Sequence, residues 1–100
     1  MQQSLIRYRT KPEQAAANEK LVRAVFAELH DSAPDGLSYA TFRLADQVTF
    51  IHLVRGDGEP SPLLAVKAFG EFQAGAADRF DAPPVREDLI EVGSYRMFAR

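Results

Sequence analysis

The chain has 100 residues, 46% of them hydrophobic, which suits one globular domain over residues 1–100 and argues against disorder. Its formal net charge of -2 comes from scattered charges of both signs, which argues against nucleic-acid or anionic-membrane partners. The absence of cysteine excludes disulfides, thiolate nucleophiles and zinc–thiolate sites. No apolar stretch suits a signal peptide or a membrane span, so we expect a cytoplasmic protein.

The first predicted elements are a strand and a long helix. Residues 4–9 interleave apolar and charged side chains at the period of a β-strand. Thr10 and Glu13 have the spacing of a capping box and Pro12 suits a first helical turn, so a helix is expected to begin here. Residues 31–36 contain Pro and Gly and end this helix. Its predicted buried face consists of apolar side chains at three- and four-residue spacing: Ala15, Leu21, Val22, Val25, Phe26 and Leu29.

A hairpin is predicted next. Residues 37–44 and 48–54 are rich in aromatic and β-branched side chains, which favour strands. The connecting segment 45–47 is short enough for a hairpin turn, and residues 55–60 form a loop. The two strands should therefore be antiparallel neighbours.

A second helix and a long last strand complete the chain. Ser61 can cap this helix with Pro62 at its first position, and Gly75 marks a point where the helix can break. Residues 86–98 supply the final strand. The predicted buried stripe of the helix is Ala65, Phe69, Phe72, Ala76 and Phe80.

The resulting order β-α-β-β-α-β predicts an α+β fold of the ferredoxin-like type. In this arrangement four antiparallel strands form one sheet, with the first and third strands in the centre. Right-handed crossovers place both helices on the same face of the sheet.

The strands predict a homodimer because they carry large apolar side chains on both faces. Helices can cover only one face of such a sheet, and a face open to water should carry polar side chains. Residues 48–54 instead place apolar side chains at both parities, and residues 37–44 and 86–98 do the same. A second copy of the chain is the simplest cover, because a two-fold interface needs only one self-complementary surface.

The chain resembles the antibiotic biosynthesis monooxygenase-like family of the dimeric α/β barrel superfamily. The resemblance covers nearly the whole sequence and is carried by residues 8–13, 21–26, 35–42, 48–52 and 69–80. It implies a homodimer with facing sheets and a pocket between the sheet and the helices of each subunit. Members of the family oxygenate aromatic polyketides without metal or flavin, or degrade haem.

Haem is not expected as a partner of this chain. The haem-degrading branch of that family uses Asn, Trp and a helical His. The chain contains no Trp, and its His52 falls on a predicted strand. The resemblance therefore implies no cofactor.

His52 is the candidate catalytic residue. It lies in the predicted central third strand between Ile51 and Leu53, where a solvated side chain is not expected. A pocket histidine can act as a general base toward a phenolic substrate, because its pKa is easily adjusted near neutral pH. The alternative is a hydrogen-bonded histidine of the core or dimer interface without a chemical role.

The hairpin register decides which side chains share the face of His52. A two-residue turn at Asp46 and Gln47 pairs Thr41 with His52, whereas a three-residue turn pairs Ala40 with it. The two-residue turn separates polar and apolar side chains better and is preferred. It places Tyr39, Thr41 and Arg43 beside His52, with Tyr39 and Arg43 as candidate substrate-binding residues. It leaves as an apolar core Phe42, Leu44, Ile51 and Leu53.

Two further sets of side chains have a functional and a structural interpretation. Arg7 and Arg9 share one parity of a central strand; Arg7 is a candidate for binding an anion or enolate, and the alternative is an ion pair with Glu91. The tyrosines could present a phenol to a ligand, or pack with the hydroxyl at a wet edge: Tyr8, Tyr39 and Tyr95. Two separated histidines do not make a metal site.

Three functions stay open from the sequence. The first is a cofactor-independent monooxygenase acting on a small aromatic substrate, which can supply the electrons once it is deprotonated. The second is a non-catalytic dimeric module that binds a small ligand or serves in stress. The third is an isomerase or lactone-handling enzyme on the same fold.

Overall fold

A computed structural model describes residues 2–56 and 61–97. The predicted loop at residues 57–60 and the predicted end of the last strand at Phe98 lie outside these ranges. None of the helices in the described ranges combines the length and the apolar character that crossing a membrane requires. The elements are β1 (Gln2–Arg9), η1 (Pro12–Gln14), α1 (Ala15–Ser32), β2 (Leu37–Arg43), β3 (Thr49–Gly56), η2 (Pro62–Ala65), α2 (Lys67–Ala74), α3 (Ala76–Arg79) and β4 (Val85–Asp88).

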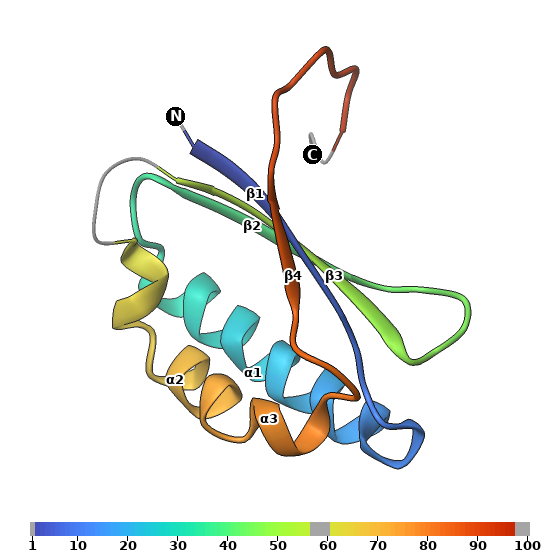
Figure 1. The fold of residues 1–100 in the computed structure, drawn as a ribbon. Coiled ribbons are helices and arrows are strands. Elements are labelled where there is room, and N and C mark those ends of the chain that lie inside the picture. The colour runs from blue at the N-terminus through green and yellow to red at the C-terminus, as the bar shows by residue number, and fades with distance from the viewer. Residues whose placement is uncertain (1, 57–60, 98–100) are drawn as a thin grey trace.

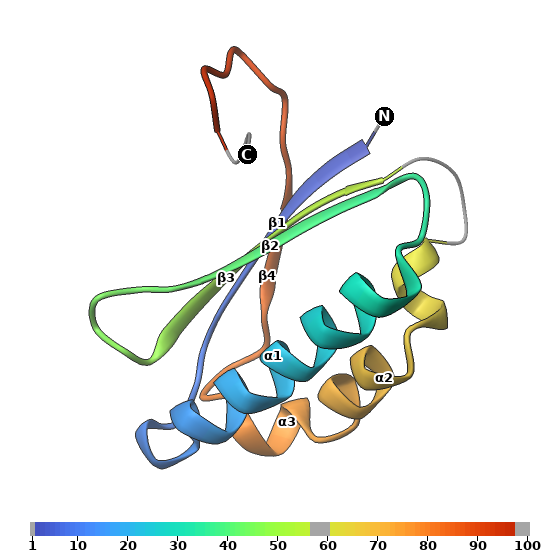
Figure 2. The ribbon, with the colours of Figure 1, turned by 180° about the vertical axis from the view of Figure 1, so that it is seen from behind.

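The sheet has the predicted ferredoxin-like topology. Its strands follow the order β2-β3-β1-β4 and every neighbouring pair is antiparallel, so the first and third strands are central. The helices lie together on one face and the other face is bare, as the two opposite views show (Figure 1, Figure 2). The fold class predicted from the element order is confirmed.

The hairpin has the two-residue register. Thr41 pairs with His52 and Tyr39 pairs with Val54. The turn is held by the Asp46 carboxylate, which accepts hydrogen bonds from the backbone N–H of residues 48 and 49. Gln47 takes a left-handed backbone conformation with φ 68. This register puts Tyr39, Thr41 and His52 on the helix-facing side of the sheet.

The apolar core lies on the face opposite to the predicted one. The predicted set around Phe42, Ile51 and Leu53 occupies the bare face, and Phe42 is 39% exposed. The helices cover the His52 face instead. Both faces of the strands carry apolar side chains, so the register alone does not determine which face the helices cover. The buried core cluster consists of Tyr8, Val22, Val25, Phe50, Leu63, Val66, Phe72 and Phe80.

The first helix begins later than the capping pattern predicts. Thr10 does not cap it, because its hydroxyl donates to the carbonyl of Val48. The chain instead forms the short turn η1 and enters α1 at Ala15. The helix ends at Ser32, followed by Ala33 in a left-handed conformation. Asn18 lies within the buried stripe of this helix, among apolar neighbours.

The second helical region is divided at Gly75, as the sequence predicted. The Ser61 hydroxyl accepts a hydrogen bond from the N–H of Leu63, which starts η2 rather than a continuous helix. The helix α2 ends at Ala74 and α3 starts at Ala76, so the break falls at Gly75.

The last strand is much shorter than predicted. It spans Val85–Asp88 at the edge of the sheet, paired with β1. One more hydrogen bond joins the Leu89 N–H to the carbonyl of Gln3, next to the first residue of β1. The chain continues past the sheet, away from the helices (Figure 1). This segment exposes Ile90, Val92, Tyr95 and Met97.

Candidate functional site

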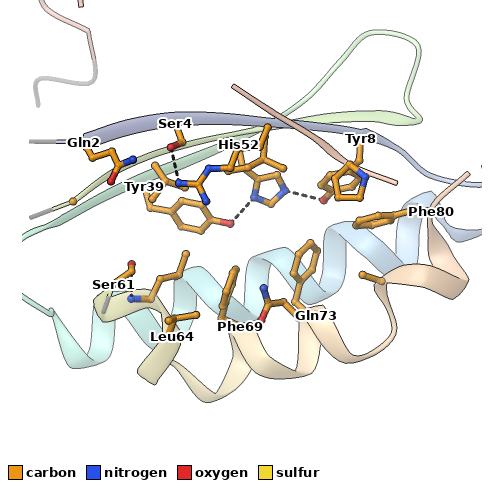
Figure 3. Close-up of a pocket in the computed structure, with 18 residues that line it drawn as sticks. Gln2, Ser4, Tyr8, Tyr39, His52, Ser61, Leu64, Phe69, Gln73 and Phe80 are labelled. Atoms are coloured by element: carbon orange, nitrogen blue, oxygen red, sulfur yellow. Dashed lines mark hydrogen bonds between the residues drawn. The ribbon is translucent and has the colours of Figure 1, made fainter. Parts of the chain in front are cut away.

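A cavity of about 490 Å³ lies between the sheet and the α2 region. Its wall is mainly aromatic and aliphatic, with side chains from β1, β2 and β3 on one side and from η2 and α2 on the other (Figure 3). Tyr39 and His52 lie on the sheet side, and Phe69 and Gln73 face them from the helix. A space of this size and character suits a small, largely apolar molecule.

His52 is held at both ring nitrogens. Its Nε2 lies 2.8 Å from the Tyr8 hydroxyl, and its Nδ1 lies 2.5 Å from the Tyr39 hydroxyl (Figure 3). The Thr41 hydroxyl lies 3.2 Å from the same Nδ1. His52 is 4% exposed, so solvent competes little for these bonds. Three neighbouring strands supply these groups, which explains why the hairpin register is needed to assemble them.

Two buried side chains from the helices extend this hydrogen-bond chain. The Asn18 amide donates from Nδ2 to the Tyr8 hydroxyl at 2.8 Å. Arg79 donates from Nε to Asn18 Oδ1 at 3.0 Å and from Nη2 to the carbonyl of Phe72 at 2.5 Å. Asn18 is fully buried and Arg79 is 6% exposed. The result is a continuous chain from Arg79 through Asn18, Tyr8 and His52 to Tyr39.

The direction of every hydrogen bond in this chain follows from its first member. Arginine can only donate, so Asn18 accepts at Oδ1 and donates from Nδ2 to Tyr8. The Tyr8 proton must then go to His52 Nε2, since a buried hydroxyl without an acceptor is costly. His52 therefore carries its proton on Nδ1 and donates it to Tyr39. Tyr39 accepts from His52 and from Thr41 in this arrangement, which leaves its own hydroxyl proton for a group in the cavity that it lines.

Burial sets the protonation of these groups. Desolvation lowers the pKa of His52 to about 4, so the ring is neutral at neutral pH, as its role as acceptor and donor requires. Desolvation raises the pKa of Tyr39 to about 12, opposed by a hydrogen bond from Thr41. It also raises the pKa of Tyr8, opposed mainly by Asn18. Both phenols are thus held as neutral hydrogen-bond donors.

The structure brings together some of the predicted site residues and not others. His52 and Tyr39 line the cavity and contact each other. Arg43 lies at the end of β2 outside the cavity lining, where it bonds the carbonyl of Gln47 and forms an ion pair with Glu19 at 3.0 Å. Arg7 is exposed on the bare face of the sheet, opposite Ile51. Neither arginine contributes to the cavity.

The predicted ion pair with Glu91 is not formed by the β1 arginines. Arg9 pairs with Asp81 at 3.5 Å, and Glu91 pairs with Arg55 at 3.7 Å. Tyr95 is exposed and lies in the segment beyond β4, away from the cavity. Across residues 2–56 and 61–97, no three His, Asp or Glu side chains gather in a way that could hold a metal ion.

Sequence reasoning missed the polar members contributed by the helices and by β4. Asn18 interrupts an otherwise apolar helical stripe, which is a signal that could have identified it. In the single helix expected from the sequence, Arg79 follows Phe72 by seven residues and would share its face. Arg86 and Ser4 also line the cavity, but only the pairing of β1 with β4 places them there.

No protein-family model and no curated protein matches the sequence. Solved structures do match the fold. The provisionally named antibiotic biosynthesis monooxygenase from Nitrosomonas europaea aligns with a TM-score of 0.76 at 11% identity, over 93% of this chain and 100% of that one. The Mycobacterium tuberculosis protein Rv0793 aligns with a TM-score of 0.73 at 17% identity, over 93% and 96% of the two chains.

The chain has the fold of the antibiotic biosynthesis monooxygenases. A third match, PA3566 from Pseudomonas aeruginosa, has a TM-score of 0.72 at 18% identity, over 92% of this chain and 95% of that one. The resemblance predicted from the sequence is thereby confirmed for the fold. At these identities the comparison speaks to the fold alone, so the function rests on the cavity and its residues.

Proposed function

We propose that the chain is a cofactor-independent monooxygenase that acts on a small, electron-rich aromatic molecule bound in the cavity. The observation that supports this most directly is the position of the Tyr39 hydroxyl, which bonds His52 at the end of a buried hydrogen-bond chain and lines a largely apolar cavity. The names of the structural neighbours agree with this reaction class.

Tyr39 would act on the oxygen of the substrate. A phenol held neutral by burial is a strong hydrogen-bond donor, and it stabilises an enolate or phenolate more than the neutral ketone or phenol. This lowers the pKa of the bound substrate and favours its ionised form. The ionised substrate can pass electrons to O₂, and a methylene beside the ring then becomes a carbonyl with release of water.

The predicted role of His52 as general base stays a prediction. Both of its ring nitrogens are bonded to tyrosines, so any proton that it takes from a substrate has to pass through one of those hydroxyls. In the proposed mechanism His52 is a positioning residue, which holds Tyr39 in the orientation that donates into the cavity.

Oxygen uptake tests this function. Anthrone, an aromatic ketone with an acidic methylene, serves as the probe, and uptake is measured above its spontaneous oxidation. We expect Tyr39→Phe to reduce the accelerated rate by about 10- to 100-fold, since it removes one donor to the developing oxyanion. The exposed Tyr95→Phe variant is the matched control and should react like the wild type. Equal rates for the Tyr39→Phe variant and the wild type would overturn the role of Tyr39.

A non-catalytic ligand-binding module is the second candidate. It is favoured by the full occupancy of the His52 nitrogens and by a pKa near 4, which makes this ring a weak base. The same experiment separates the two functions. Binding of the probe without any acceleration of oxygen uptake supports the binding module.

We further propose that the active form is a homodimer. The bare face of the sheet carries apolar side chains on all four strands: Leu5, Ala40, Phe42, Ile51, Leu53 and Val85. The segment after β4 exposes further apolar groups beside this sheet edge. Both would be removed from water by a second copy of the chain.

A further inference from the structure

We propose that Arg86 makes the cavity selective for a small aromatic carboxylate, whose ring lies between the sheet and α2. The inference rests on the proposed binding of a small aromatic molecule in this cavity and adds the charge of that molecule. Among the cavity-lining residues that the structure describes, Arg86 is the only charged one. A single cation in an otherwise neutral, mostly apolar wall favours an anionic ligand.

Arg86 is exposed at the edge of the sheet, bonds a buried serine, and still has donors to offer. Its Nη2 donates to the Ser4 hydroxyl at 3.0 Å, and Ser4 is 4% exposed. Ser4 Oγ in turn donates to Asp88 at 3.5 Å. Within residues 2–56 and 61–97, no carboxylate forms an ion pair with Arg86. A guanidinium has five N–H donors, so most of them are available to a carboxylate.

The sheet register places Arg86 opposite the Tyr39 end of the cavity. Ile6 pairs with His52 on one side and with Arg86 on the other, so these three residues form one row across the sheet. Two strand spacings separate His52 from Arg86, which is about 10 Å between backbones. Ile6 lies between them on the same face, so a ring would lie over Ile6, between the sheet and α2. The ligand would place a carboxylate on Arg86 and a hydroxyl or carbonyl oxygen on Tyr39.

A monoanion suits this position better than a phosphate. One guanidinium supplies a single positive charge and a planar pair of N–H groups that match a carboxylate. Asp88, bonded to the same Ser4, adds negative charge nearby and disfavours a dianion. The remaining polar lining groups are neutral: Gln2, Ser4, Tyr8, Tyr39, His52, Ser61 and Gln73.

Calorimetric titration of two matched probes tests the inference. 4-Hydroxybenzoate and 4-hydroxybenzamide have the same size and differ in the charge of one group. We expect the wild type to bind the carboxylate at least about 10-fold more tightly than the amide, with a preference that shrinks as salt is added. Arg86→Gln should weaken carboxylate binding about 10- to 100-fold and leave amide binding within about twofold.

Matched variants separate the possible outcomes. Glutamine keeps an N–H for Ser4, so Arg86→Gln preserves the local structure, and Arg23→Gln removes a positive charge from the exposed side of α1 without effect on binding. Amide binding by the wild type without any preference for the carboxylate would overturn the role of Arg86 and leave the aromatic cavity standing. Failure of the wild type to bind either probe would contradict the proposed function as well. Retention of the carboxylate preference in Arg86→Gln would also refute the inference.

Discussion

At the scale of single residues, His52 couples the protonation of the site to the stability of the fold. Its neutral form both accepts from Tyr8 and donates to Tyr39, whereas the protonated ring would be unable to accept from Tyr8. In the unfolded chain the ring binds a proton near pH 6.5, and in the folded protein burial delays this to about pH 4. Between pH 6.5 and pH 4 the unfolded state therefore binds more protons than the folded state, so acidification favours unfolding.

We accordingly predict that the free energy of unfolding falls as the pH decreases from 6.5 toward 4. The contribution of His52 is fully present above pH 6.5, and its loss amounts to about 3 kcal/mol when the pH reaches 4. Urea unfolding at a series of pH values measures this. His52→Gln should flatten the dependence in this range, whereas replacement of the exposed His30 by Gln should leave it as in the wild type. An unchanged slope in His52→Gln would show that other groups cause it.

The part of the site that could be predicted from the sequence is the part that lies on the hairpin. A strand alternates sides at every residue, so the turn at Asp46 and Gln47 fixes the neighbours of His52. The other members come from elements far away in the sequence. Asn18 and Arg79 meet only because α1 and the end of the second helical region pack over the same strands, and no local pattern reports that packing.

At the scale of elements, Gly75 matters because of its close approach to Arg79. A Cβ added at this position would lie 2.9 Å from Arg79 Nη1. That guanidinium is anchored to Asn18 and to the carbonyl of Phe72, so it cannot move aside without breaking a bond of the buried chain. The break between α2 and α3 thus provides the space that the arginine occupies.

Two glycine-to-alanine substitutions test this interpretation. Gly70→Ala lies in the interior of α2 with nothing within 4 Å of the new Cβ, and should raise the free energy of unfolding by about 0.5–1 kcal/mol through helix propensity. Gly75→Ala should lower it by about 1–2 kcal/mol through overpacking. Denaturant unfolding of both variants provides the comparison. Equal stabilisation by the two would mean that Arg79 adjusts freely.

Helices and strands could be predicted where their pattern depends on nearby residues in the sequence. They could be predicted less well where a strand's length depends on the strand with which it pairs. The periodicity of residues 15–29 and the break at Gly75 depend on neighbours along the chain, and both predictions are confirmed. The last strand depends on pairing with β1, and that pairing stops at Ser4 and Asp88. Its apolar residues are typical of a strand, but no local pattern shows where the pairing with β1 stops.

At the scale of the whole molecule, the sheet has one covered and one bare face. The strands carry more apolar side chains than the covered face can bury. The remaining ones lie around Leu53 and Ile51 on the bare face. A small domain buries a limited share of its surface on its own, so association is the most direct way to bury more. The same contact would bring the segment after β4 against another copy.

We predict that the wild type sediments as a dimer and that Leu53→Lys converts it to a monomer. Leu53 lies on β3 between Leu5 and Ala40, in the middle of the bare face, where an unpaired charge would have to be buried on association. The expected weakening of the dimer is at least about 100-fold, measured by analytical ultracentrifugation. Leu64→Lys is the matched control, because Leu64 is exposed on η2 at the opposite, helix-covered side and should leave the dimer intact. A wild type that sediments as a monomer would contradict the proposed dimer. A Leu53→Lys variant that remains dimeric would show that the interface does not include the bare face.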